Sequence, residues 1–185
     1  MSNGTLTPPV GPDDHAQGSG EAPVTLVEFG DYECAHCRRA YAILEHVRRE
    51  LGDALRFVFR NFPLREAHPH AEHAAEAAES VAARGGEIAF WEMHDLLYEN
   101  QDALEDAHLL AYAAAAGVDE RGVADDLATG ATATRVQKDF RSGVRSGVNG
   151  TPTFFVNGRR YDGDWTDAPG FAADLLSLAR AGSHR

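Results

Sequence analysis

The sequence predicts an α/β protein in which strands alternate with helices. Three observations carry this prediction: two short strand-like runs at 24–29 and 55–61, an amphipathic helical pattern between them, and a long alanine-rich block before a final strand pair. Strands separated by a helix indicate a parallel, right-handed crossover. The predicted order is strand, helix, strand, helical block, strand, strand, helix, and no internal repeat is visible.

The N-terminal third opens with an arm and continues into the first crossover. Residues 1–22 are predicted to be extended or mobile, because their prolines and glycines break any regular pattern. The run 24–29 is rich in β-branched residues and reads as a strand. The segment 35–51 is predicted to be a helix that ends at Gly52, and the second strand follows at 55–61. Apolar residues recur in that helix at spacings of three and four: Tyr41, Leu44, Val47 and Leu51.

A helical pattern extends from His70 to about Gly147. Glycines interrupt it at three places, so roughly five helices are expected there. These interruptions are Gly85-Gly86, Gly117 and Gly130.

Strand character returns at 153–157. The dipeptide Asn157-Gly158 is a strong two-residue turn signal, so 159–161 is expected to pair back as a hairpin. A last helix is predicted over about 168–181.

Composition limits the classes of function. The chain has 185 residues, 43% of them hydrophobic, 9% aromatic and 25% charged, which fits one soluble globular domain enlarged by an insertion. Its net charge of −12 lacks the basic footprint of nucleic-acid binding. No apolar run is long enough for a signal-peptide core or a membrane span, so a cytoplasmic location without membrane insertion is expected.

Cys34 and Cys37 are the only cysteines, and they lie between the first strand and the first helix. In a cytoplasmic protein such a pair is expected to be catalytic, redox-sensing or metal-binding. The positive end of a helix dipole favours a thiolate, which makes Cys34 the expected nucleophile. Cys37 lies one turn further on and is placed to resolve a mixed disulfide.

These residues resemble the DsbA-like thiol–disulfide oxidoreductases of the thioredoxin superfamily. The resemblance rests on Val-Glu-Phe-Gly-Asp-Tyr-Glu-Cys-Ala-His-Cys at 27–37, on Gly-Thr-Pro-Thr-Phe-Phe-Val-Asn-Gly at 150–158, and on the helical block between them. It spans nearly everything after residue 20, and thioredoxin itself has a far shorter interval between the two motifs. It implies a thioredoxin-like domain at 23–66 and 148–185, with an inserted helical domain at 67–147.

The resemblance also implies roles for residues around the cysteines. Pro152 corresponds to the cis-proline of the family, which together with Thr151 would hold a substrate peptide beside Cys34 and keep metals away. His36 would stabilise the Cys34 thiolate, and Glu28 would be the buried acid that shuttles a proton to or from the resolving cysteine.

Each role has a plainer alternative. Pro152 would then be a trans proline that starts a strand, His36 a solvated surface residue and Glu28 an exposed residue on a sheet edge. Ala35 stands where many relatives carry proline, which leaves the redox potential open.

The residues just before the cysteines are expected to lie at the surface. They are Asp31, Tyr32 and Glu33. Their acids would raise the pKa of Cys34 and so oppose the helix dipole and His36.

Two further clusters have competing interpretations. Histidines 68, 70 and 73 suggest zinc bound together with the two cysteines, but they are better explained as polar residues at a helix start. The aromatic run 90–97 is expected to pack in the core of the helical block, and a substrate-facing groove is the alternative.

The predicted function is enzymatic exchange of thiols and disulfides with protein or peptide substrates and with an unidentified redox partner. No cofactor or metal is expected, because electrons move between cysteine pairs. One alternative is a non-catalytic redox-sensing or zinc-holding interaction module of the same fold. Another is a glutathione-dependent transferase or isomerase of the kappa-like branch, which usually carries serine at the position of Cys34. The direction stays open, because His36 favours an oxidant and a reducing cytosol favours a reductase or isomerase.

Overall fold

The computed structural model describes residues 4–182, which fall into two compact units. The first, termed the sheet unit, contains residues 4–30, 39–60 and 142–182. The second, termed the helical unit, contains residues 31–38 and 61–141. The segment that holds both cysteines therefore groups with the helical unit. The predicted domain boundaries, which kept the cysteines with the strands, stay a prediction.

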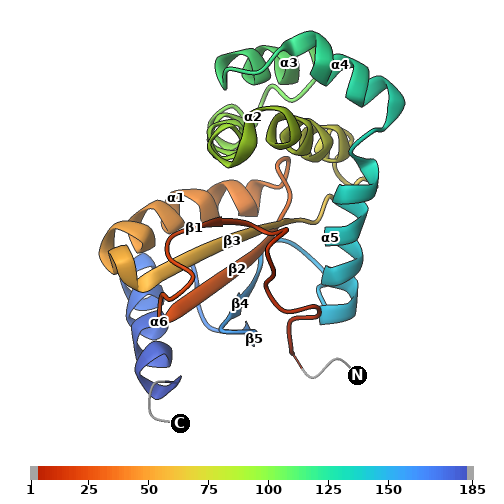
Figure 1. Ribbon diagram of the computed structural model, residues 1–185. Helices are drawn as coiled ribbons and strands as arrows, with labels where there is room; N and C mark the ends of the chain where they lie inside the picture. The colour runs from red at the N-terminus through yellow and green to blue at the C-terminus, as the bar shows by residue number, and fades with distance from the viewer. Residues whose placement is uncertain (1–3, 183–185) are drawn as a thin grey trace. The chain divides into compact units, whose positions relative to one another are not determined.

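The strands form one five-stranded sheet in the order β1-β3-β2-β4-β5 (Figure 1). β1 pairs antiparallel with β3, β2 with β4, and β4 with β5. The neighbours β2 and β3 are joined through helix α1 and a short 3₁₀ turn. The strands are β1 His15–Gln17, β2 Val24–Gly30, β3 Leu55–Asn61, β4 Thr153–Val156 and β5 Arg159–Tyr161. The predicted α/β fold is confirmed, and β1 is a strand that the sequence pattern did not predict.

The N-terminal arm is held to the sheet unit by Arg60 of β3. The Arg60 guanidinium donates to both carboxylate oxygens of Asp14, at 2.8 Å each, and to the carbonyl oxygens of Pro8 and Pro9. Leu6 of the arm is also buried. A charge buried in this way is stable only when it is paired and hydrogen-bonded, which explains why the arm follows one path.

The predicted hairpin between β4 and β5 is confirmed. Val156 lies opposite Arg159, so Asn157 and Gly158 form the two-residue connection. Both have positive φ, 48° and 80°, as the turn between right-twisted antiparallel strands requires. The Asn157 side chain also accepts a hydrogen bond from the backbone of Thr25, which ties the turn to β2.

Aromatic residues form much of the core of the sheet unit. Phe29 of β2 meets Phe155 of β4 edge to face at 5.8 Å between ring centroids. On helix α6 (Ala168–Gly182), which packs against β2, Phe171 lies 5.5 Å from Phe154. Helix α1 (Ala35–Leu51) buries three of the predicted apolar residues, Leu44, Val47 and Leu51. Tyr41 is only half-buried, and Ala40 is buried in its place.

The helical unit holds helix α2 and its neighbours (Figure 1). The helices between β3 and β4 are α2 Ala71–Glu99, α3 Asp106–Ala115, α4 Glu120–Thr129 and α5 Ala133–Ser146. Gly86 interrupts α2 with a φ of 78°, a conformation that favours glycine. Since α2 consists of two helical stretches on either side of Gly86, the block holds five helical stretches, as predicted.

A buried polar cluster joins the end of β3 to α2 and α5 within the helical unit. The backbone and side-chain nitrogens of Asn61 both donate to Asp139 of α5, and the side chain also donates to Glu79 of α2 at 2.7 Å. Arg135 pairs with both acids. The nitrogens of Asn61 and the carboxylates of Glu79 and Asp139 are thus paired inside the helical unit.

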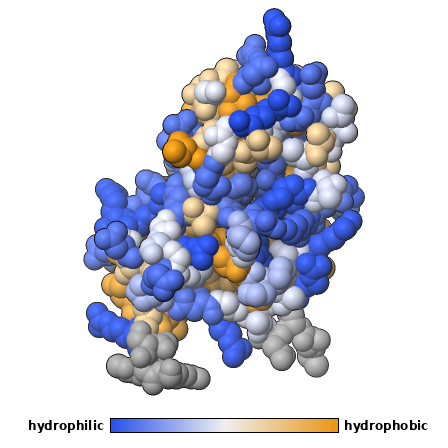
Figure 2. All heavy atoms as spheres, viewed as in Figure 1, coloured by the Kyte–Doolittle hydropathy of each residue, from blue (hydrophilic) through white to orange (hydrophobic). Residues whose placement is uncertain are grey.

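Most of the face seen in Figure 2 is hydrophilic, with hydrophobic residues in small separate groups. Across residues 4–182, the helices are all too short or too polar to cross a membrane.

Candidate redox site

Cys34 lies immediately before α1, and Cys37 lies in its first turn. Both cysteines are buried, Cys34 at 5% exposure and Cys37 at 0%. The Cys34 carbonyl oxygen accepts the backbone N–H of Arg38 at 3.1 Å, which is the first hydrogen bond of the helix. Cys34 therefore occupies the start of a helix of 17 residues, where the helix dipole stabilises negative charge.

Asp31 organises the approach to the cysteines. Its side chain is fully buried, and it accepts hydrogen bonds from the backbone N–H groups of Glu33 and Leu64, each at 2.8 Å. Its carbonyl oxygen accepts the N–H of Cys34 at 3.2 Å, and its own N–H donates to the Sγ of Cys37 at 3.5 Å. The prediction that this acid lies at the surface is wrong, because its carboxylate is the acceptor around which the loop folds.

Tyr32 is buried as well, contrary to prediction. Its hydroxyl is hydrogen-bonded to the Nδ1 of His94 at 3.1 Å, and its ring lies 5.0 Å from that of Tyr98. His94 in turn meets Trp91 edge to face. The aromatic run on α2 is buried, as expected for core packing, and it packs directly against the residue two positions before Cys34.

Two further contacts hold the loop that leads to Cys34. The Gln101 side chain donates to the carbonyl oxygens of Tyr32 and Cys34, at 2.8 and 2.9 Å. The Glu33 carboxylate, which is only partly buried, accepts the backbone N–H of His70 at 2.7 Å. Side chains and backbone of the helical unit thus fix each residue from Asp31 to Cys34.

His36 is exposed on the first turn of α1, between the two cysteines, as is Ala35. The neighbouring Arg38 forms an exposed ion pair with Asp102 at 3.3 Å. The role predicted for His36 in tuning Cys34 stays a prediction.

The histidines near Pro69 have partners of their own. His68 is hydrogen-bonded to Asp31 and His73 to Asp106, at 2.8 and 2.7 Å. Within the described range 4–182, no three or more histidines, cysteines or acids are grouped so that they could hold a metal ion. The histidines are therefore associated with acids and backbone groups of the helical unit.

Glu28, Thr151 and Pro152 belong to the sheet unit. Glu28 is buried on β2, opposite Phe154 of β4, so the alternative that it is exposed on an edge is wrong. The peptide bond between Thr151 and Pro152 is cis, and both residues lie just before β4. The six predicted site residues thus form two sets, with Cys34, His36 and Cys37 in the helical unit and the other three in the sheet unit.

The sequence interpretation missed Asp31, His68, His94 and Gln101 as parts of the site. One signal was present for the first two. Asp31 follows the first predicted strand and His68 follows the second, and loops at the carboxyl ends of parallel strands meet at one edge of a sheet. His94 and Gln101 carried no comparable signal, because their contacts depend on how α2 packs.

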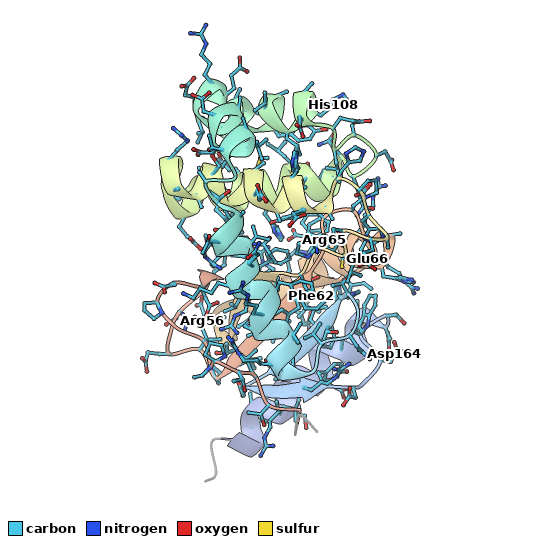
Figure 3. The ribbon with its side chains drawn as sticks, turned by 90° about the vertical axis from the view of Figure 1, so that its right-hand side faces the viewer. Arg56, Phe62, Arg65, Glu66, His108 and Asp164 are labelled. Atoms are coloured by element: carbon cyan, nitrogen blue, oxygen red, sulfur yellow. The ribbon has the colours of Figure 1, made fainter. Side chains whose placement is uncertain are left out.

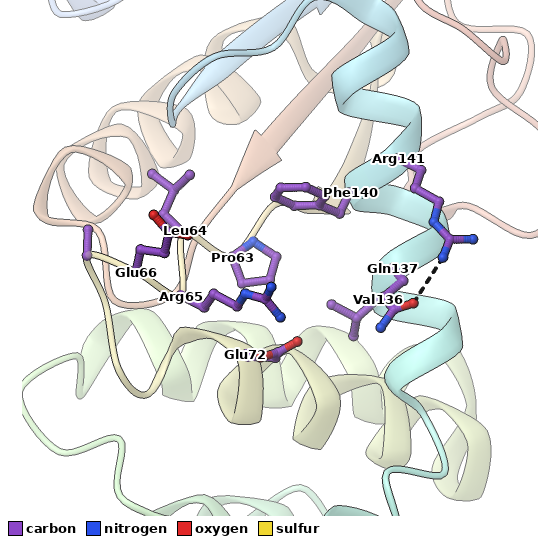
Figure 4. Close-up of a pocket in the computed structure, with 10 residues that line it drawn as sticks. Pro63, Leu64, Arg65, Glu66, Glu72, Val136, Gln137, Phe140 and Arg141 are labelled. Carbon is purple, nitrogen blue, oxygen red and sulfur yellow. Dashed lines mark hydrogen bonds between the residues drawn. The ribbon is translucent and has the colours of Figure 1, made fainter.

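A pocket of about 660 Å³ lies beside the loop that follows β3 (Figure 4). Pro63 and Leu64 face it from the loop after β3, and Val136 and Phe140 face it from α5. Arg65 and Glu66 (labelled in Figure 3), which follow on that loop, also line the pocket and are exposed. The lining of the pocket therefore combines apolar side chains with charged ones.

The fold and the paired cysteines define a thioredoxin-type protein. The thioredoxin family model matches residues 11–169, so the chain belongs to the thioredoxin family.

Solved structures, among them DsbA-like proteins, share this fold. BdbD from Bacillus subtilis has a TM-score of 0.79 and 25% identity over 90% of this chain and 93% of its own. A thioredoxin-like oxidoreductase from Silicibacter pomeroyi has a TM-score of 0.76 and 26% identity over 92% and 94%. The thiol-disulfide exchange protein α-DsbA2 from Wolbachia pipientis shares the fold, with a TM-score of 0.72 and 21% identity over 89% and 87%. The resemblance to DsbA-like proteins is confirmed.

The curated relatives are described as Na⁺/H⁺ antiporters and not as oxidoreductases. A Na⁺/H⁺ antiporter NhaA from Salinispora tropica is 45% identical over 95% of this chain. The chain spans only about a quarter, 26%, of the length of that antiporter.

Proposed function

We propose that this chain is a thiol–disulfide oxidoreductase that exchanges disulfides with protein or peptide substrates. The observation that carries the proposal is the position of Cys34 and Cys37 at the start of α1 in a thioredoxin-family fold. The helix dipole favours the Cys34 thiolate, and Cys37 is one turn away. The 26% identical relative from Silicibacter pomeroyi, described as an oxidoreductase, supports the same chemistry.

In the reducing direction, the Cys34 thiolate attacks one sulfur of a substrate disulfide. A bond forms between Cys34 and that sulfur, and the other substrate sulfur leaves as a thiolate and takes up a proton. Cys37 then loses its proton and attacks the Cys34 sulfur, which releases the second substrate thiolate. The substrate gains two electrons, and the Cys34–Cys37 disulfide forms.

In the oxidising direction the same steps run backwards. A substrate thiolate attacks Cys34 in the disulfide and releases Cys37, and a second substrate thiolate then displaces Cys34. The substrate loses two electrons, and a partner disulfide must accept them from the protein's dithiol. The reduction potential measured against glutathione decides which direction is favoured.

The proposal assigns supporting roles to the residues of the sheet unit. Thr151 and Pro152 would hold the substrate peptide, and Glu28 would shuttle the proton of Cys37. The burial of Glu28 on β2 supports this role, because it places the carboxyl group inside the protein, away from solvent. The cytoplasmic location remains part of the proposal.

Reduction of insulin by catalytic amounts of the protein, with a dithiol as the electron source, tests the activity. The wild-type chain is expected to turn over many times, and Cys34→Ser to show only the background rate. If the wild-type protein reduces insulin no faster than the background rate, the proposed enzymatic function is wrong.

The match to NhaA favours one second candidate, a redox-sensing module of a membrane antiporter. Such a module would change oxidation state once for each signal and would need no turnover. It predicts stoichiometric oxidation of Cys34 and Cys37 without catalysis of insulin reduction. It further predicts that binding to an NhaA-type antiporter in detergent differs between the oxidised and reduced chains.

A further inference from the structure

His68 and Asp31 form a polar pair next to the cysteines. The Nδ1 of His68 is hydrogen-bonded to the Oδ2 of Asp31 at 2.8 Å. The Asp31 side chain has no solvent exposure, whereas His68 is about a quarter exposed, at 24%. Asp31 therefore fixes the orientation of an imidazole whose other side can exchange protons with water.

The same aspartate contacts both cysteines through its backbone. Its carbonyl oxygen accepts the N–H of Cys34, and its N–H donates to the Sγ of Cys37. Glu33 donates to Oδ1 of its carboxylate, whereas Leu64 and His68 both bind Oδ2. His68 is thus held by the residue that positions both thiols.

The charges around His68 favour its protonated form. Burial lowers its pKa, but the hydrogen bond to Asp31 and the negative charges of Asp31, Cys34 and Glu33 outweigh burial and raise the pKa above 6.5. The Coulomb interaction between His68 and Cys34 is reciprocal, so an imidazolium at His68 stabilises a thiolate at Cys34. A second histidine, His36 on α1, lies two positions after Cys34 in the sequence, and it is exposed.

We propose that His68, oriented by Asp31, is the cationic partner of the Cys34 thiolate. This inference rests on the proposed function only in taking Cys34 as the nucleophile. During thiol–disulfide exchange, His68 acts in the step in which Cys34 leaves a disulfide, because a stabilised thiolate is a better leaving group. The reduced dithiol form is stabilised in the same way, which makes the disulfide a stronger oxidant. His68 is a positioning residue, since it forms no bond to the substrate.

The pH dependence of Cys34 alkylation in the reduced chain tests the pair. The alkylation rate of the wild-type chain is expected to rise in two steps as the pH increases. The first step occurs when Cys34 loses its proton and forms the ion pair with His68, and the second occurs when His68 loses its proton. In His68→Gln the first step disappears and one step remains at higher pH. An opposite charge shifts a pKa by about one unit or more, so alkylation on the acid side should fall about tenfold.

His73→Gln is the matched control. His73 is also hydrogen-bonded to an aspartate through Nδ1, at 2.7 Å from Asp106, and its pKa is raised first by that bond, without a contribution from either cysteine. This variant is expected to keep the two-step profile of the wild-type chain.

A His68→Gln profile that matches the wild-type profile in both steps would overturn the proposal and assign the effect to His36. Ultraviolet absorbance of the thiolate gives an independent measure of the same ionisation. Circular dichroism confirms that each variant is folded. Neither rate nor absorbance requires turnover, so a protein without insulin-reducing activity would contradict the proposed function and leave this inference to be judged by the titration.

Discussion

The side chain of Gln101 donates a hydrogen bond to the carbonyl oxygen of Cys34 at 2.9 Å. The same amide nitrogen donates to the carbonyl oxygen of Tyr32 at 2.8 Å. A residue just beyond the end of α2 therefore holds the backbone on both sides of Glu33. The conformation of the loop before the proposed nucleophile thus depends on a residue of the helical unit that lies some 70 positions away in the sequence.

Replacement of Gln101 by alanine is expected to reduce the free energy of unfolding by about 1–2 kcal/mol, because two part-buried carbonyl groups lose their donor. Activity per folded molecule should fall as well, since the backbone of Cys34 becomes less constrained. Urea unfolding and insulin reduction measure the two effects. Gln137→Ala is the control, because Gln137 is exposed and its side chain accepts a hydrogen bond from the exposed Arg141. Equal losses in both variants would contradict the role of Gln101.

Cys37→Ser is expected to trap the protein on its substrate. Cys34 can still attack a disulfide in this variant, but no second thiol releases the mixed disulfide. Mass spectrometry should find the substrate bound to Cys34, and dithiothreitol should release it. Cys34→Ser should trap nothing, and a covalent product of that variant through Cys37 would reverse the assigned roles.

Asp14→Asn is expected to lower the free energy of unfolding by about 3 kcal/mol, because it leaves the charge of Arg60 buried without its partner. The paired side chains are only 9% and 3% exposed. Asp102→Asn breaks the ion pair with Arg38, which is 89% and 45% exposed, and should cost less than about 1 kcal/mol. Chemical unfolding of both variants gives the comparison. Similar costs would show that the N-terminal arm contributes little to stability.

Asp139 is expected to make stability depend on pH. Burial raises its pKa above 3.8, and the charge of Glu79 adds to this while Arg135 opposes it. A carboxyl group with a raised pKa binds more protons in the folded chain than in the unfolded chain. The free energy of unfolding therefore falls as pH rises from the ordinary value through the raised one.

Asp139→Asn removes this titration and should flatten the pH profile over that window. Urea unfolding of both proteins across a pH series measures how the difference between their free energies of unfolding changes with pH. Any stability that the variant loses with the contact to Arg135 does not affect the test, which depends only on the shape of the two profiles. Parallel profiles for the two proteins would contradict the raised pKa.

The sequence interpretation was accurate where local rules govern the structure. Asn157-Gly158 marked its turn because few residues adopt positive φ at both positions of a tight hairpin. The first helix was predicted closely because its apolar residues repeat at helical spacing. β1 was missed because a strand of three residues has no periodicity to detect, and it exists through its pairing with β3.

The chemical identity of the site followed from local sequence. Two cysteines at CxxC spacing, with a strand before them and a helix after them, are sufficient to predict a redox pair in which Cys34 attacks first. The residues that surround this pair could not be predicted from the local sequence. Asp31 reads as a surface acid in sequence, yet it is buried because Leu64 and His68 arrive from a distant loop to satisfy it. Such contacts depend on non-local packing, and a buried carboxylate is tolerated only when those partners are in place.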